Sequence, residues 1–330
     1  MVYIPKEARY TDMIYNYCGN SGLKIPAISL GLYRNFGSTN SYDTAKKMIE
    51  TAFDLGITHF DLANNYGEPS GSAEETFGKI LTNELKGYRD ELLIATKAGY
   101  DMWPGPYGEF GSRKYMLSSL DQSLKRLNLD YVDIYYSHRY DPNTPLEETV
   151  GALDSAVKQG KALYVGVSNY PVDKTIEAAK LFRELKTPLI MHQFQYSMFL
   201  RGAENGLFQA HEEEGIGSIV YQPLFQGLLT TKYINGIPAD SRVAQKVDSI
   251  SEDQVTEDRI QKVQKLKEIA EARGQNVPQL ALAWVLSQKT VATALIGASR
   301  PEQIVENVKT IENLHFTEEE LAIINKILQD

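Results

Sequence analysis

The sequence predicts an α/β fold, a single (β/α)8 TIM-barrel domain that spans residues 1–330. Eight short apolar runs alternate with longer segments of helical periodicity, as eight βα units require. Most of these runs lack alternating polar residues, which is typical of parallel strands buried on both faces. The chain contains no linker rich in proline, serine or glycine that would separate two halves. We therefore expect one barrel with its active site at the C-terminal ends of the strands.

The predicted elements follow one another in a regular order. Residues 13–26 are expected to form a small β-hairpin that turns at 19–22 and closes the bottom of the barrel. The candidate strands are 27–32, 57–63, 91–98, 131–137, 162–168, 188–194, 217–223 and 293–298, and helices are expected near 43–55, near 73–85 and from about 301. The long connections 98–113 and 222–256 follow strand ends, so they are predicted to be functional loops over the C-terminal face.

A doubly wound open sheet is the alternative fold. It is disfavoured because no G-x-G-x-x-G segment follows the first strand candidate. The nearest match, Gly215-Ile216-Gly217, precedes a strand and lacks the third glycine.

Composition excludes several classes of function. The chain carries 34 basic and 43 acidic residues, a net charge of −9, which argues against nucleic-acid or anionic-membrane partners. The one cysteine, Cys18, is typical of a reducing cytoplasm, and no apolar run approaches the ~18 residues that would span a bilayer. The five histidines form no metal-binding motif with the cysteine or with carboxylates, so we expect a cytoplasmic protein without a metal.

Polar residues gather at the ends of the predicted strands. Asp61 ends the second strand, Tyr66 follows in the next loop, Lys97 ends the third strand and His138 follows the fourth. A nearby ammonium at Lys97 would lower the pKa of Tyr66, and Asp61 would keep that ammonium charged. A neutral His138 would orient a carbonyl group. Together these residues predict a proton donor aimed at a carbonyl, as reduction of an aldehyde or ketone requires.

The sequence leaves an alternative role open for Lys97, and the remaining histidines are given structural interpretations. Lys97 could instead form a Schiff base, because TIM-barrel aldolases use a lysine at a strand end. His59 is interpreted as a core residue and His192 as a barrel-wall residue, whereas His211 and His315 are expected at the surface.

Four motifs resemble the aldo-keto reductase superfamily. They are FDLANNYG (60–67), LLIATKAG (92–99), YVDIYYSHR (131–139) and LYVGVSNY (163–170), and similarity continues through 192–196, 222–233 and 296–308. The resemblance places the catalytic tetrad of that superfamily on Asp61, Tyr66, Lys97 and His138. Segments 102–115, 136–149 and 235–242 resemble its bacterial L-glyceraldehyde 3-phosphate reductase branch, which is similar to the β subunits of voltage-gated potassium channels.

The resemblance implies NADPH or NADP+ bound without a Rossmann domain. It assigns the carboxamide to Ser168, Asn169 and Gln193, ring stacking to Tyr221, the diphosphate to Pro223, Leu224, Gln226, Gly227, Lys232 and Arg242, the 2′-phosphate to Gly297, Ser299, Arg300 and Gln303, and adenine to Glu306 and Asn307. A helix that starts at Pro301 would offer free N–H groups to a phosphate beyond the last strand.

The implied activity is the NADPH-dependent reduction of small polar aldehydes or ketones, such as glyceraldehyde 3-phosphate or methylglyoxal, with Tyr66 as the proton donor. The expected substrate pocket consists of Tyr33, Arg34, Trp103, Tyr107 and Arg139. Two residues depart from the pattern of the relatives: Tyr33 replaces a tryptophan, and Phe225 adds bulk near the diphosphate.

The resemblance also implies a homo-oligomer, a tetramer or octamer, because relatives in this branch assemble through helices and loops at the side of the barrel. A cofactor-sensing regulatory subunit with little turnover is the alternative function.

Overall fold

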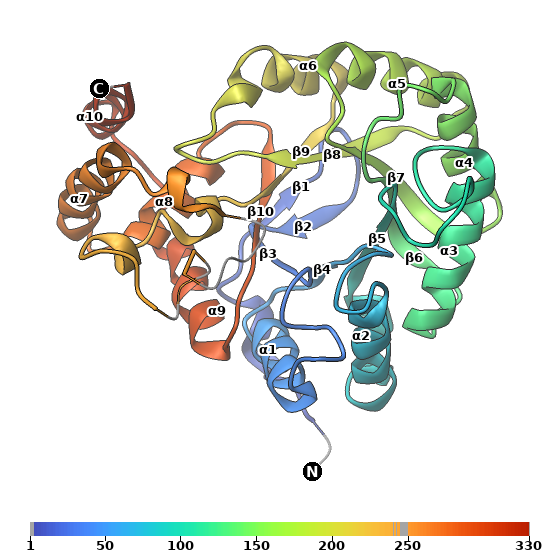
Figure 1. Ribbon diagram of the computed structural model, residues 1–330, viewed down its shortest axis with the longest axis horizontal. Coiled ribbons are helices and arrows are strands. Elements are labelled where there is room, and N and C mark those ends of the chain that lie inside the picture. The colour runs from blue at the N-terminus through green and yellow to red at the C-terminus, as the bar shows by residue number, and fades with distance from the viewer. Residues whose placement is uncertain (1–2, 240, 242, 245–249, 330) are drawn as a thin grey trace.

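A computed structural model describes residues 3–329 except 240, 242 and 245–249. It is a closed barrel of parallel strands with helices around the outside (Figure 1). The prediction of a (β/α)8 TIM barrel is therefore confirmed.

The barrel strands run in chain order around the ring, and the last strand closes on the first. They are β3 (Ile28–Gly31), β4 (His59–Asp61), β5 (Leu93–Ala98), β6 (Val132–Ser137), β7 (Ala162–Ser168), β8 (Leu189–Gln195), β9 (Gly217–Tyr221) and β10 (Val291–Ile296). All eight overlap the predicted runs. Every residue of β6 and of β10 is buried, as expected for strands covered on both faces.

The helices surround the barrel and supply its crossover connections (Figure 1). They are α1 (Tyr42–Asp54), α2 (Ser72–Asn83), α3 (Arg113–Leu127), α4 (Leu146–Lys158), α5 (Val172–Glu184), α6 (Leu207–Glu214), α7 (Glu257–Ala272), α8 (Val277–Leu286), α9 (Pro301–Val308) and α10 (Glu318–Gln329). Both α7 and α8 lie between β9 and β10, and α7 begins directly after the long connection at 222–256. No helix in the described part of the chain combines the length and the apolar character that a membrane crossing needs.

The N-terminal hairpin closes the bottom of the barrel, as predicted. Strands β1 (Tyr15–Tyr17) and β2 (Lys24–Pro26) pair antiparallel, and the Asn20 amide in their turn donates a 2.8 Å hydrogen bond to the Gly215 carbonyl. A Cβ at Gly19, whose φ is +55°, would lie 2.1 Å from that carbonyl oxygen. Because Gly215 lies two residues before the start of β9, the hairpin packs at the N-terminal end of the strands and leaves the opposite end free for the site.

Strand register brings the candidate site residues to the C-terminal end of the ring. Gly31 pairs with Asp61, and Lys97 pairs with Tyr136, one residue before the end of β6. The interior of the barrel below them is filled by a separate apolar cluster that includes Ile134, Tyr136, Met191, Ile219 and Leu295.

Candidate active site

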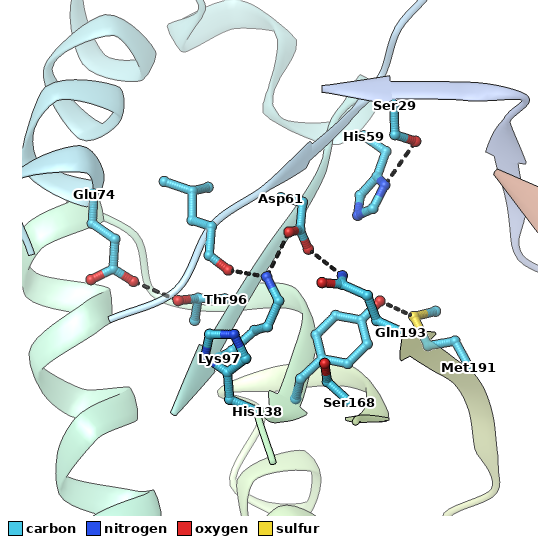
Figure 2. A network of polar contacts seen from close by, with 12 residues as sticks. Ser29, His59, Asp61, Glu74, Thr96, Lys97, His138, Ser168, Met191 and Gln193 are labelled. Carbon is cyan, nitrogen blue, oxygen red and sulfur yellow. Dashed lines mark hydrogen bonds and ion pairs between the residues drawn. The ribbon is translucent and has the colours of Figure 1, made fainter. Parts of the chain in front are cut away.

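Lys97 and Asp61 form a buried ion pair inside the barrel. The Lys97 Nζ atom lies 2.6 Å from Asp61 Oδ2 and donates a second 2.6 Å hydrogen bond to the Leu62 carbonyl. The other carboxylate oxygen, Oδ1, accepts a 2.9 Å hydrogen bond from Gln193 Nε2 on β8. Figure 2 shows Asp61 between these two donors. Burial lowers the pKa of Lys97, although Asp61 opposes that shift. Both charged side chains are thus shielded from water, and each is fixed by hydrogen bonds at the ends of the strands.

Tyr66 lies in the loop after β4, against the cation of this pair. Its ring centroid is 5.0 Å from Lys97 Nζ, and the Lys97 carbonyl fixes the start of the loop by accepting a 2.9 Å hydrogen bond from the Asn64 amide. Burial, followed by the charge of Asp61, raises the pKa of Tyr66 well above its ordinary value. The net shift of the Tyr66 pKa is therefore upward, whereas the Lys97 ammonium was expected to lower it. The reason is that Asp61 offsets the lysine charge while burial disfavours a phenolate.

His138 follows β6 and turns its imidazole toward Tyr66. The two ring centroids lie 5.7 Å apart in an edge-on arrangement, and the Tyr100 ring contacts His138 at 4.6 Å. Burial, then the charges of Lys97 and Arg139, lower the pKa of His138 well below its ordinary value. The imidazole is neutral at pH 7, and its Nδ1 atom has no hydrogen-bond partner among the described residues. A neutral donor beside a tyrosine hydroxyl is suited to binding a carbonyl oxygen.

A second group of polar side chains lies at the ends of β7, β8 and β9. Asn169 has a left-handed backbone with φ of 56°, and its Nδ2 donates to the His138 carbonyl at 3.1 Å and to Ser168 Oγ at 3.0 Å. Asn169 Oδ1 accepts a 2.7 Å hydrogen bond from the Tyr221 hydroxyl. The structure therefore brings Ser168, Asn169 and Tyr221 together, with Gln193 on the strand between them.

The loop after β9 has an unusual backbone. Gln222, Phe225 and Gln226 all have positive φ, between 44° and 58°, a conformation that non-glycine residues rarely adopt outside functional or constrained turns. The buried Oε1 atom of Gln226 has no hydrogen-bond partner among the described residues, so the loop retains an acceptor for a bound hydroxyl. Pro223 is buried, while Leu224 and Gly227 are partly exposed.

Phe225, which was expected to add bulk near the diphosphate, has a buried side chain. Its side chain is 6% exposed, packs at 5.9 Å against Phe199, and is covered by the Arg259 guanidinium at 4.9 Å. Its bulk therefore enters the core. Further along the loop, Lys232 is exposed, and Arg242 lies outside the described residues.

Helix α9 begins at the end of β10 with an exposed arginine. Arg300 is the residue before the first turn, its side chain is 64% exposed, and Glu302 lies 3.9 Å from it. Gln303 turns back to accept a 2.7 Å hydrogen bond from the Ser299 amide, and Gly297 is exposed. The Arg300 guanidinium at a helix N-terminus is suited to a phosphate, although the Ser299 amide is already bonded to Gln303. Glu306 is exposed and pairs with Lys309, whereas Asn307 is buried.

The five expected pocket residues lie in three different surroundings. The half-exposed ring of Tyr33 lies 4.9 Å from the Tyr66 ring, and the Arg34 guanidinium lies 4.9 Å from the Tyr33 ring. Trp103 instead packs at 5.2 Å on Tyr115, and Tyr107 is exposed beside Lys114, so no contact joins either to the tetrad. The fifth, Arg139, is paired with Glu109 on the loop after β5.

Three residues at this site were not identified from the sequence. Tyr100 contacts both His138 and Arg139, Glu109 binds Arg139, and Asn64 donates a 2.9 Å hydrogen bond to the Tyr115 hydroxyl. The position of Tyr100 two residues beyond a strand end was the available signal for it. Glu109 gave none, because its role depends on the path of a long loop.

The histidines outside the site follow the sequence interpretation with one exception. His59 and His192 are buried, as expected, and His315 is exposed. His211 is fully buried, and the expectation of a surface position is wrong. Its Nε2 atom lies 3.0 Å from His192 Nδ1, and its Nδ1 atom lies 2.7 Å from Ser218 Oγ. No cluster of three or more potential metal ligands occurs in the described ranges.

Comparison with known proteins agrees with this geometry. The model of the Aldo/keto reductase family matches residues 27–329. The L-glyceraldehyde 3-phosphate reductase of Escherichia coli (strain K12) is 53% identical over 334 aligned positions, which cover 100% of this chain and 96% of that protein. A probable voltage-gated potassium channel subunit beta of Arabidopsis thaliana is 37% identical over 91% of this chain and 92% of its own length. A putative voltage-gated potassium channel subunit beta of Schizosaccharomyces pombe is 37% identical over 95% of this chain and 93% of its own length.

Proposed function

The chain belongs to the aldo/keto reductase family and is an oxidoreductase, and on that premise we propose that it reduces small polar aldehydes or ketones with NADPH. The observation that supports this reaction most strongly is the placement of Tyr66 between the Lys97 ammonium and the neutral imidazole of His138. We propose further that residues 1–330 act as one domain that carries the whole site.

We propose that Tyr66 is the proton donor. Its raised pKa keeps the hydroxyl protonated at neutral pH, so a proton is available whenever a carbonyl group is bound. The ring N–H of neutral His138 would hold the carbonyl oxygen beside that hydroxyl. As the proton leaves, the ammonium of Lys97 would stabilise the negative charge that develops on the phenol oxygen. A bound NADPH supplies the hydride that the carbonyl carbon takes up.

The residues expected to hold NADPH are suited to its parts. Ser168, Asn169 and Gln193 would bind the carboxamide and Tyr221 would lie against the nicotinamide ring, since all four lie within two residues of the C-terminal ends of the neighbouring strands β7, β8 and β9. The loop from Pro223 to Lys232, with Leu224, Gln226 and Gly227, would follow the diphosphate. The start of α9, with Gly297, Ser299, Arg300 and Gln303, would bind a 2′-phosphate, and Glu306 and Asn307 would contact adenine.

The alternative role of Lys97 as a Schiff-base nucleophile is disfavoured by its contacts. The side chain is 0% exposed, and its ammonium is bound by Asp61 and by the Leu62 carbonyl. An attacking amine must be neutral and must reach the substrate. Borohydride in the presence of an aldehyde should therefore trap no adduct on Lys97.

The candidate substrates are short aldehydes such as glyceraldehyde 3-phosphate and methylglyoxal, the first because of the 53% identity to the bacterial reductase. Tyr33, which lies against Tyr66, and Arg34, which lies over Tyr33, would contact the substrate. The competing function is a cofactor-sensing subunit, favoured by the 37% identity to channel β subunits.

One spectrophotometric experiment tests the proposal. Purified protein should oxidise NADPH only when an aldehyde is added, and Tyr66→Phe should abolish this turnover while the affinity for NADPH stays within about twofold. Tight NADPH binding without turnover across an aldehyde panel would support the regulatory function instead. A Tyr66→Phe variant that retained the wild-type kcat would show that Tyr66 is not the proton donor.

A further inference from the structure

Arg139, the residue after His138, is enclosed by the loop that follows β5. Its Nε donates a 2.8 Å hydrogen bond to the Gly99 carbonyl, and its Nη2 lies 2.8 Å from Glu109 Oε2. The guanidinium carbon also lies 4.5 Å from the Tyr100 ring centroid and 4.1 Å from that of Phe110. The Arg139 guanidinium is therefore bound by one carbonyl and one carboxylate and lies against two aromatic rings.

The loop backbone is shaped around this contact. Phe110 has a φ of 68°, and its amide donates a 2.9 Å hydrogen bond to the same Gly99 carbonyl that accepts from Arg139. A bulky aromatic residue rarely adopts a positive φ, and such strain persists only where the surrounding contacts hold it. The Phe110 ring against the guanidinium is one of those contacts. The Arg139–Glu109 pair is therefore part of an ordered loop.

Arg139 is also close to the reacting groups. The Tyr100 ring that it contacts lies 4.6 Å from the His138 ring, so a single aromatic side chain separates the guanidinium from the proposed carbonyl-binding imidazole. A guanidinium one aromatic side chain away from that imidazole is suited to binding the phosphate or carboxylate of a short substrate. The carboxylate of Glu109 already takes up that charge.

We propose that Glu109 restricts the use of anionic aldehydes by holding Arg139 in an internal ion pair. The inference deepens the proposed function and rests on it, since it concerns which aldehydes the Tyr66 site accepts. A second guanidinium near Tyr66 is that of Arg34, which has no carboxylate partner among the described residues and contacts Tyr33. Anionic substrates would then bind through Arg34 alone, and neutral aldehydes would be unaffected by the ion pair.

The test compares kcat/KM for glyceraldehyde 3-phosphate with that for uncharged glyceraldehyde in matched variants. Glu109→Gln should raise the ratio of phosphorylated to neutral substrate about tenfold, the size of one partly exposed charge-assisted contact. Burial and the neighbouring Asp101 carboxylate raise the pKa of Glu109, so Asp101 is close enough to replace it. Asp101→Asn/Glu109→Gln removes that substitute and should show at least the same gain.

Two further variants identify the cause of the gain. In Glu109→Gln/Arg139→Gln the gain should disappear, because the released guanidinium is gone. Asp121→Asn removes one acidic charge from another exposed ion pair, the 2.7 Å contact with Lys161, and should leave the ratio unchanged. An unchanged ratio in both Glu109 variants would overturn the proposal. So would a gain that persists without Arg139, since it would then come from the general loss of negative charge.

Failure of the proposed function can be distinguished from failure of this inference. If the wild type reduces neither aldehyde, the proposed function is wrong, whereas a wild type that reduces both with a ratio insensitive to Glu109 refutes only the inference. Calorimetric binding of inorganic phosphate gives a readout without turnover. Glu109→Gln should bind phosphate about tenfold more tightly than the wild type, and Glu109→Gln/Arg139→Gln should not. Equal phosphate binding in all three proteins would also refute the inference.

Discussion

Asp61→Asn leaves the Lys97 ammonium buried without its counter-charge. The two side chains are 3% and 0% exposed, and removal of one partner from such a buried pair lowers the free energy of unfolding by about 3–5 kcal/mol. The Gln193 hydrogen bond to the first carboxylate oxygen survives, because the new amide keeps an oxygen there. Burial already lowers the pKa of Lys97, so this side chain can lose its proton once Asp61 is neutral. We therefore expect the lower end of the range, about 3 kcal/mol.

The matched double variant separates charge burial from packing. Lys97→Met leaves the Asp61 carboxylate buried and should cost about 3–5 kcal/mol. Asp61→Asn/Lys97→Met contains neither charge, and its main defect is a Leu62 carbonyl without its donor, which costs about 1–3 kcal/mol. The double variant should therefore be less destabilised than the sum of the single variants by at least about 2 kcal/mol.

Urea unfolding followed by circular dichroism measures these free energies. The exposed pair Lys161–Asp121 is the control, and its double-mutant cycle should give a coupling below about 1 kcal/mol. Aldehyde reduction should be lost in all three site variants, including the more stable double variant, because Tyr66 loses its neighbouring cation in each. A double variant as unstable as the sum of the single variants would refute the argument that the two buried charges depend on each other.

Three other predictions concern the cofactor, pH and assembly. Arg300→Ala should raise the KM for NADPH about tenfold and that for NADH less than about twofold in steady-state assays. The tenfold effect is at the low end of the range for a phosphate contact, because Arg300 is 64% exposed. Burial lowers the pKa of His211 to about 3 and that of His192 well below 6.5, so the unfolded chain binds more protons in acid. The free energy of unfolding should therefore fall as the pH drops from about 6.5 toward about 3, by up to about 1.4 kcal/mol per pH unit for each of these two histidines. In urea titrations at several pH values, His211→Gln should make this dependence on pH less steep. Light scattering at low micromolar concentration should show about four chains or more, and a species of 37.1 kDa would exclude a homo-oligomer.

The fold was readable from the sequence because parallel barrel strands have a distinctive local pattern. The run 131–137, for example, is largely apolar on both faces, and β6 in the structure covers all of it except its first residue. His211 shows where this reading fails. Its helix ends in three glutamates, which indicates a solvated face, yet the histidine points inward to His192 and Ser218. An eight-residue helix has too few turns for its pattern to show which side is buried.

The candidate site was only partly predictable for a related reason. Strand ends located Asp61, Lys97 and His138, because the ends of parallel strands meet at one rim. The direction of the Tyr66 pKa shift depends on burial, which local sequence does not reveal. The Arg139–Glu109 pair joins residues 30 positions apart through a loop whose path follows from a left-handed Phe110. No periodic pattern encodes such a contact.

The location of Glu109 has an evolutionary consequence. Its side chain is 40% exposed and belongs to a loop, whereas the tetrad side chains are carried by, or anchored to, the barrel strands. One nucleotide change converts a glutamate codon to one for glutamine, lysine or glycine, and none of these replacements disturbs the barrel core. Substrate charge preference can therefore diverge between descendants of this gene by single mutational steps while the reduction chemistry is inherited unchanged.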